Sequence, residues 1–196
     1  SQCFQAFDVC YDYDIFDLFQ DYLAGRVPLE RYAEAVNRQE VIYPYNFVKL
    51  RFLENHDRAR AAFLIPDRAS LLNWTAFLYF QKGLTLLYAG QEAACTHRPG
   101  LFDRDPVDWH TGQDDAQLLR TLSTIKHNYL LTDSRYEVRA LPGDILRACH
   151  RGKNRQLVGI FSVRGNSALA EAGVPDGFYP NLADGRPVEV CGGMIR

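Results

Sequence analysis

The stretch from Phe52 to Asp57 carries the side chains whose types could do chemistry. It reads Phe-Leu-Glu-Asn-His-Asp and follows an alternating run, Phe47 to Leu53, that predicts a β-strand. A carboxylate and an imidazole at the carboxyl end of a parallel strand lie where barrel enzymes place their active-site groups. An aspartate after a strand is, however, more often a helix N-cap or a loop residue. On this stretch alone, the structural interpretation outweighs the catalytic one.

Alternating strand-like and helix-like segments must position that stretch. The run from Phe7 to Tyr13 predicts a first strand, and Asp14 then caps a helix whose apolar residues recur up to Leu23. Pro28 suits the first position of a second helix, which precedes the strand at 47–53.

A third strand and two further helices follow. Asp67 can cap a helix that runs to about Lys82, and the apolar run 84–88 is typical of a fully buried parallel strand. Residues 115–131 predict a helix. Its inward side chains are expected to be Leu118, Leu119, Leu122, Ile125 and Tyr129. Such alternation implies βα units and a parallel sheet, but three strands are too few to close a barrel.

The pattern changes after residue 133, where short strands and turns replace the helices. Pro142-Gly143, Asp176-Gly177 and Asp184-Gly185 are turn signals. The strands predicted between them cover 136–141, 145–149, 157–163, 178–182 and 188–191. We therefore expect an antiparallel all-β domain at the C-terminal end of the chain.

Five motifs, in this order along the chain, resemble the α-amylase family, glycoside hydrolase family 13. Residues 7–14 are similar to strand 6 of that family, and 52–57 to the region that ends strand 7 in Asn-His-Asp. Residues 86–92 resemble the strand 8 signature, and 101–109 the loop that follows it. Residues 178–185 resemble the closing strands of the C-terminal β domain. The resemblance spans essentially the whole chain.

The resemblance implies a partial (β/α)8 TIM barrel in residues 1–133, made of strands 6–8 with their helices. An antiparallel β-sandwich domain then follows in residues 134–196. The family hydrolyses α-glucosidic bonds with retention, using a nucleophile, an acid and a third carboxylate that stabilises the transition state. Asp57 matches the third carboxylate, and His56 matches the imidazole that binds the sugar. Arg104, on the loop after strand 8, would bind distant sugar units, although a surface ion pair explains it equally well.

The family's nucleophile and acid/base residues lie on strands 4 and 5, which this sequence does not contain. Two other glutamates could be considered as replacements for these residues. We interpret Glu40 as a solvated helix residue and Glu92 as a structural residue, so neither is placed to act as nucleophile or acid/base. We therefore expect the C-terminal portion of an enzyme that acts on α-glucans or oligosaccharides, inactive alone. A non-catalytic carbohydrate-binding or interaction module is the alternative. No cofactor or metal is expected, because caps and turns explain Asp8, Asp12 and Asp14 better.

Composition and charge narrow the choice of partners. The net charge of −2 offers no basic field for nucleic acid, and no apolar run is long enough for a membrane helix. Five scattered cysteines, read mostly as buried thiols, point weakly to a cytoplasmic location. A three-stranded slice would leave sheet edges and inner faces uncovered, so we predict homo-oligomers or pairing with the missing barrel half.

Overall fold

The computed structural model describes residues 3–129 and 133–195, and its first half contains a short parallel sheet. Its strands are β1 (Val9–Tyr11), β2 (Val48–Arg51) and β3 (Leu84–Thr85), in the order β1-β2-β3. Both pairings are parallel, so the predicted succession of three parallel strands is confirmed. The third strand is shorter than predicted and is not fully buried, because no further strand or helix among the described residues covers its outer face.

The first four helices along the chain include two of a single turn. They are α1 (Cys3–Ala6), α2 (Tyr13–Leu23), α3 (Leu29–Ile42) and α4 (Ala61–Leu64). Helix α2 begins earlier than predicted: Asp12, not Asp14, holds the N-cap position, and its side chain bonds elsewhere instead of capping the helix. Gly25 ends this segment with a positive φ of 71°, which glycine adopts without a steric penalty.

Two longer helices and one short turn complete the helical part. These are α5 (Arg68–Phe80), the 3-10 helix η1 (Gln91–Ala93) and α6 (Ala116–Tyr129). The cap prediction for α5 is confirmed, because Asp67 accepts a hydrogen bond from the Ser70 N–H at 2.8 Å. In α6, Leu119 and Leu122 face inward as predicted, but Tyr129 is exposed at the end of the helix. Leu131, predicted to continue it, lies outside the described residues.

The C-terminal part is antiparallel throughout, as predicted. Its main sheet has the order β4-β5-β6, with β4 (Arg135–Leu141), β5 (Ile145–Arg151) and β6 (Gln156–Ser162). Two ribbons follow, β10 with β7 and β8 with β9. Their bounds are β7 (Ala170–Glu171), β8 (Gly177–Pro180), β9 (Pro187–Val190) and β10 (Met194–Ile195).

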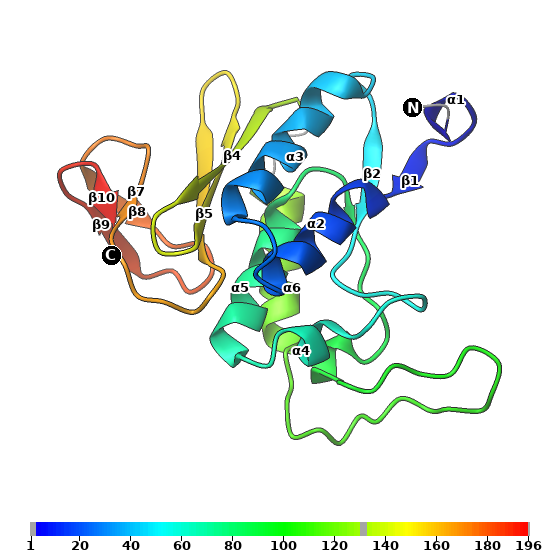
Figure 1. The fold of residues 1–196 in the computed structure, drawn as a ribbon. Helices are drawn as coiled ribbons and strands as arrows, with labels where there is room; N and C mark the ends of the chain where they lie inside the picture. Colours follow the sequence, from blue (N-terminus) through cyan, green and yellow to red (C-terminus); the bar gives the residue numbers. More distant parts are fainter. Residues whose placement is uncertain (1–2, 130–132, 196) are drawn as a thin grey trace.

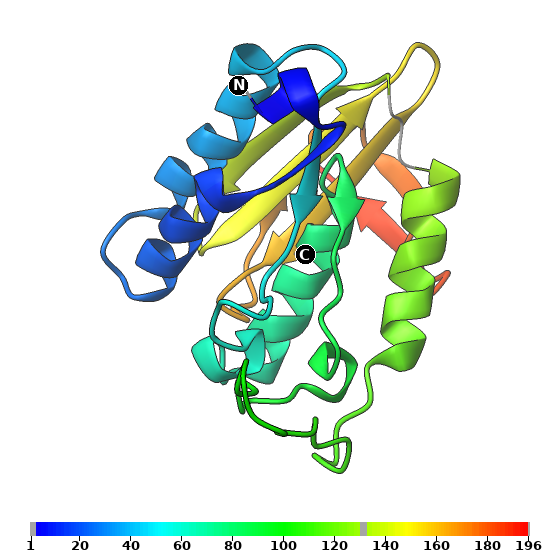
Figure 2. The ribbon, with the colours of Figure 1, turned by 90° about the vertical axis from the view of Figure 1, so that its right-hand side faces the viewer.

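These parts are stacked in layers (Figures 1 and 2). The helices α2, α3, α5 and α6 lie between the parallel sheet and the sheet β4-β5-β6, and the small ribbons lie beyond the latter. One hydrophobic core joins the helices to the antiparallel sheet, since Trp74 and Phe77 of α5 share it with Phe161 of β6. Asn37 of α3 adds a polar clamp: its amide donates to the Val138 carbonyl at 2.7 Å and accepts from the Val138 N–H at 2.8 Å.

The face of the parallel sheet that points away from the helices is apolar, and no described residues cover it. Register places Val9 beside Val48, and Tyr11 beside Leu50 and Leu84, on one face of the sheet. Val9, Tyr11 and Leu84 are all exposed there. Among the described residues, one apolar face of the parallel sheet is therefore uncovered.

Membrane-spanning potential and cysteine burial can also be read from the described residues. No helix in the described ranges is long and apolar enough to cross a membrane. The cysteines are less buried than predicted: Cys95 and Cys149 are buried, whereas Cys3 and Cys191 are exposed.

Candidate active site

The Asn-His-Asp segment lies at the carboxyl edge of the parallel sheet. Strand β2 ends at Arg51, and the chain stays buried through Asn55 before it turns outward. The side chains of His56 and Asp57 are each 51% exposed at this turn. The structure therefore presents a carboxylate and an imidazole at the edge where a parallel sheet gathers its functional groups.

The Asp57 carboxylate is held on one of its two oxygens. The Tyr13 hydroxyl donates to Oδ2 at 3.3 Å, and Nε2 of His56 lies 3.5 Å from the same atom. The Asp57 N–H donates to Oδ1 of Asn55 at 2.9 Å, which fixes the backbone. Oδ1 of Asp57 accepts no hydrogen bond from the residues that the structure describes, so it is free to bind a ligand from solvent.

Asn55 links the end of β2 to the start of α2. Its amide nitrogen donates to the Tyr13 hydroxyl oxygen at 2.9 Å, while its amide oxygen holds the Asp57 N–H. The Arg58 guanidinium lies over the Tyr13 ring, 5.1 Å from its centroid, which is a cation–π distance. The interpretation of Asn55 as the residue that keeps the strand end in shape agrees with these contacts.

Glu54, beside this segment, is sealed in the interior. It accepts from Nη1 of Arg60 and from the Ala61 N–H, both at 2.6 Å. Burial raises the pKa of Glu54, although these two hydrogen bonds oppose the rise. Arg60 in turn donates to the His97 carbonyl at 3.0 Å and lies over the Tyr88 ring. The pair fastens the end of β2 to the segment after β3.

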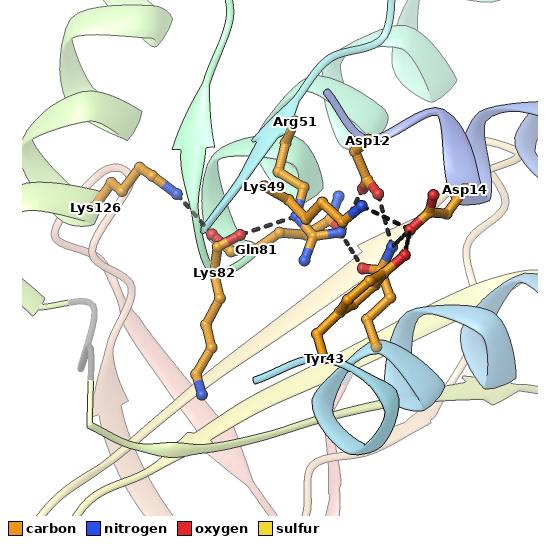
Figure 3. A network of polar contacts seen from close by, with 9 residues as sticks. Asp12, Asp14, Tyr43, Lys49, Arg51, Gln81, Lys82 and Lys126 are labelled. Carbon is orange, nitrogen blue, oxygen red and sulfur yellow. Dashed lines mark hydrogen bonds and ion pairs between the residues drawn. The ribbon is translucent and has the colours of Figure 1, made fainter. Parts of the chain in front are cut away.

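A buried polar network lies on the helix-facing side of the sheet (Figure 3). Arg51 forms an ion pair with Asp12 and donates to Gln39, which itself donates to Asp12 at 2.6 Å. Next to it, Lys49 donates to Asp14 at 2.7 Å. Although partial burial opposes it, hydrogen bonds from Lys49 and from a tyrosine lower the pKa of Asp14.

Sequence reasoning missed this network, because it explained Asp12 and Asp14 by caps and turns. The available signal was the alternation of Lys49 and Arg51 along β2, which puts two cations on one face of a strand. Asp12 and Asp14, which follow the neighbouring strand β1, carry the opposite charges and pair with these two cations. The network joins the carboxyl end of β1 to β2, from which the chain continues to Asp57.

The remaining predicted positions lie apart from Asp57. Arg104 is exposed on the loop between η1 and α6 and forms no ion pair or hydrogen bond with a described residue, Asp57 and His56 included. Glu92 accepts from the Gly90 N–H at 2.9 Å, in keeping with a structural role. The interpretation of Glu40 as a solvated residue is wrong, since it is half-buried in an ion pair with Lys82. Within the described ranges, no His, Cys, Asp and Glu side chains are grouped so as to hold a metal ion.

Comparison with known proteins gives the following matches. Residues 137–196 match the family described as the bacterial alpha amylase C-terminal domain. Alpha-amylase 2 of Dictyoglomus thermophilum is 24% identical over 123 residues, which are 58% of this chain and 22% of that protein. The crystal structure of an alpha-amylase from Lactobacillus plantarum is 36% identical, with a TM-score of 0.93, and matches 100% of this chain and 47% of its own. A maltogenic alpha-amylase from Thermotoga neapolitana is 25% identical, with a TM-score of 0.81, over 98% of this chain and 48% of its own.

These matches confirm the resemblance to glycoside hydrolases of the α-amylase family. Within that family, the chain corresponds to the C-terminal portion. It spans about half the length of the two solved structures and about a quarter of the curated relatives.

Proposed function

We propose that residues 1–196 form part of the active-site wall of a retaining glycosidase that acts on α-glucans or oligosaccharides. The half-exposed Asp57 carboxylate, at the carboxyl edge of the parallel sheet, is the observation that carries this proposal. The similar proteins named as alpha-amylases support the substrate class.

In this proposal, Asp57 stabilises the transition state and His56 binds the sugar in the cleavage subsite. A positive charge develops on the sugar ring during glycoside hydrolysis, and a fixed carboxylate nearby stabilises it. The free Oδ1 of Asp57 can accept from a ring hydroxyl, and Nε2 of His56 lies beside the same carboxylate. Arg104, exposed on its loop, would bind a sugar unit farther along the chain of the substrate.

We further propose that β1, β2 and β3 are strands 6 to 8 of a (β/α)8 barrel and that 134–196 is the β-sandwich domain that follows it. The parallel pairing in chain order and the uncovered apolar face favour a sheet that continues on both edges. An α-glucan would then bind at the carboxyl edge once the remaining strands, from the same or another polypeptide, cover that face.

The 196 residues alone should not catalyse hydrolysis. Retention requires a nucleophile and an acid/base about 5–5.5 Å apart. Among the described residues, Glu54 is sealed by Arg60, and Glu92 bonds the backbone at Gly90. Neither is free to attack an anomeric carbon or to protonate the leaving oxygen.

Reducing-sugar release from soluble starch and maltooligosaccharides tests the proposal. We expect no turnover by the 196-residue chain, and turnover by a longer protein that supplies the remaining strands. Asp57→Asn in that longer protein should lower kcat by about a hundredfold or more. Turnover by the isolated chain that disappears with Asp57→Asn would overturn its predicted inactivity. Saturable oligosaccharide binding without turnover by either form would favour a binding module instead.

A further inference from the structure

We propose that Tyr13 is a positioning residue that aims the Asp57 carboxylate, an inference that rests on the proposed role of Asp57. Its hydroxyl donates a hydrogen bond to Oδ2 of Asp57 at 3.3 Å. Tyr13 comes from a different βα unit, the first residue of α2, so it approaches the carboxylate from across the edge of the sheet.

The direction of this hydrogen bond is fixed by Asn55. The Asn55 amide nitrogen donates to the Tyr13 hydroxyl oxygen at 2.9 Å, so the hydroxyl hydrogen is left for Asp57. Asn55 is buried, and its oxygen already accepts the Asp57 N–H, which prevents the amide from turning round. Donor chains of this kind polarise each bond in turn and strengthen it.

The Tyr13 ring is held from several sides. It packs edge-on against Phe52, with centroids 5.2 Å apart, and lies under the Arg58 guanidinium. The preceding residue, Asp12, is anchored by its buried ion pair with Arg51. Because both its ring and its backbone are fixed, the hydroxyl can act as a rigid stop for Oδ2 and leave Oδ1 facing outward.

A rigid carboxylate matters more to the transition state than to the bound substrate. Charge on the sugar develops as the bond breaks, and a small displacement of a stabilising group then raises the barrier. Loss of the Tyr13 hydroxyl should therefore lower kcat and leave KM nearly unchanged. A residue with a merely structural role would lower stability without this separation of the two constants.

The test compares three variants of the full-length protein that contains this chain, with maltooligosaccharide as substrate. Tyr13→Phe should reduce kcat roughly ten- to hundredfold, the effect of losing a hydrogen bond to a charged group, and change KM less than about twofold. Tyr45→Phe removes an exposed hydroxyl at the opposite end of β2 and should leave both constants unchanged. Thermal unfolding of Tyr13→Phe should stay close to that of the unaltered protein.

Asp57→Asn separates the two proposals. If it abolishes turnover and Tyr13→Phe has an unchanged kcat, the positioning role is overturned while the proposed function stands. If turnover survives Asp57→Asn, the proposed role of Asp57 and the inference built on it both fail. A Tyr13→Phe protein that loses kcat and unfolding temperature together, with KM raised in parallel, also contradicts positioning.

Discussion

At the scale of single residues, the most constrained charges are those of Arg51 and Asp12. Both side chains are almost wholly buried, and the Arg51 guanidinium also bonds Gln39 and the Lys82 carbonyl. Such a pair adds little net stability over apolar residues, but removing one partner leaves an uncompensated charge in the interior. The pair therefore helps to hold Asp12, which follows β1, against the end of β2.

Arg51→Leu should destabilise the chain by about 3–5 kcal/mol, since Asp12 would remain buried without its cation. Urea unfolding of the 196-residue chain, followed by circular dichroism, measures the loss. Arg31→Leu is a matched control, because Arg31 pairs with Glu34 on the exposed side of α3 and should matter little. Equal stability of the two variants would show that the buried pair is dispensable.

Single-sequence reasoning could place Asp57 and His56 at a strand end, because strand alternation and the Asn-His-Asp motif are local. It could not find Tyr13 as a partner of Asp57. The two residues are 44 positions apart, and only the parallel pairing of β1 and β2 brings them together. The buried network of Asp12, Gln39 and Arg51 could not be predicted for the same reason, because its members are far apart in the sequence.

At the scale of elements, His150 joins β5 to the end of α5. Its imidazole donates from Nε2 to the Phe80 carbonyl at 2.8 Å, and Nδ1 lies 2.9 Å from the Ser134 hydroxyl. Burial, with a smaller contribution from Lys82 and Lys126, lowers the pKa of His150 to about 4. The ring is therefore neutral in the folded protein near neutral pH.

This pKa predicts a pH dependence of stability. Between pH 6.5 and about 4, the unfolded chain binds a proton at His150 that the folded chain does not, so stability falls as the pH falls. The fall from this group amounts to roughly 3 kcal/mol. His150→Gln should lack that part of the decline, which urea unfolding at pH 7, 5.5 and 4.5 would detect. Parallel curves for both proteins would refute the assignment.

Helices and long strands could be predicted because their periodicity extends over many residues. The inward positions of Leu119 and Leu122 in α6 were correct, and so was the Asp67 cap of α5. The two-residue strands β7 and β10 were missed, since two residues carry no periodicity and form a ribbon only through partners 23 and 25 positions away. The fully buried character assigned to 84–88 failed because the apolar run has no cover in this chain.

At the scale of the whole molecule, the uncovered face of the parallel sheet dominates behaviour in solution. Val9, Tyr11 and Leu84 expose apolar surface on one face, and β1 and β3 are both edge strands. Exposed apolar faces and unpaired edges drive association. Because no described residue covers this face, it is a surface that a second copy of the chain can cover.

We predict that the isolated chain self-associates through this face. Sedimentation velocity at increasing concentration should show oligomers, and the double variant Val9→Lys, Leu84→Lys should shift the distribution toward monomer. Val41→Lys, an exposed apolar position at the end of α3, is the matched control and should have no such effect. If the chain without substitutions stays monomeric at every concentration, the prediction is contradicted.

The Asn37 clamp has a consequence for how this architecture can change in evolution. One side-chain amide of α3 takes the place of a neighbouring strand for Val138, satisfying its N–H and its carbonyl together. A shorter, longer or apolar side chain would leave both groups without a partner. Substitutions in α3 and β4 are therefore coupled, and homologues should exchange them as a matched set. A recombination point between the helices and the β4-β5-β6 sheet would separate that set and yield poorly folded hybrids.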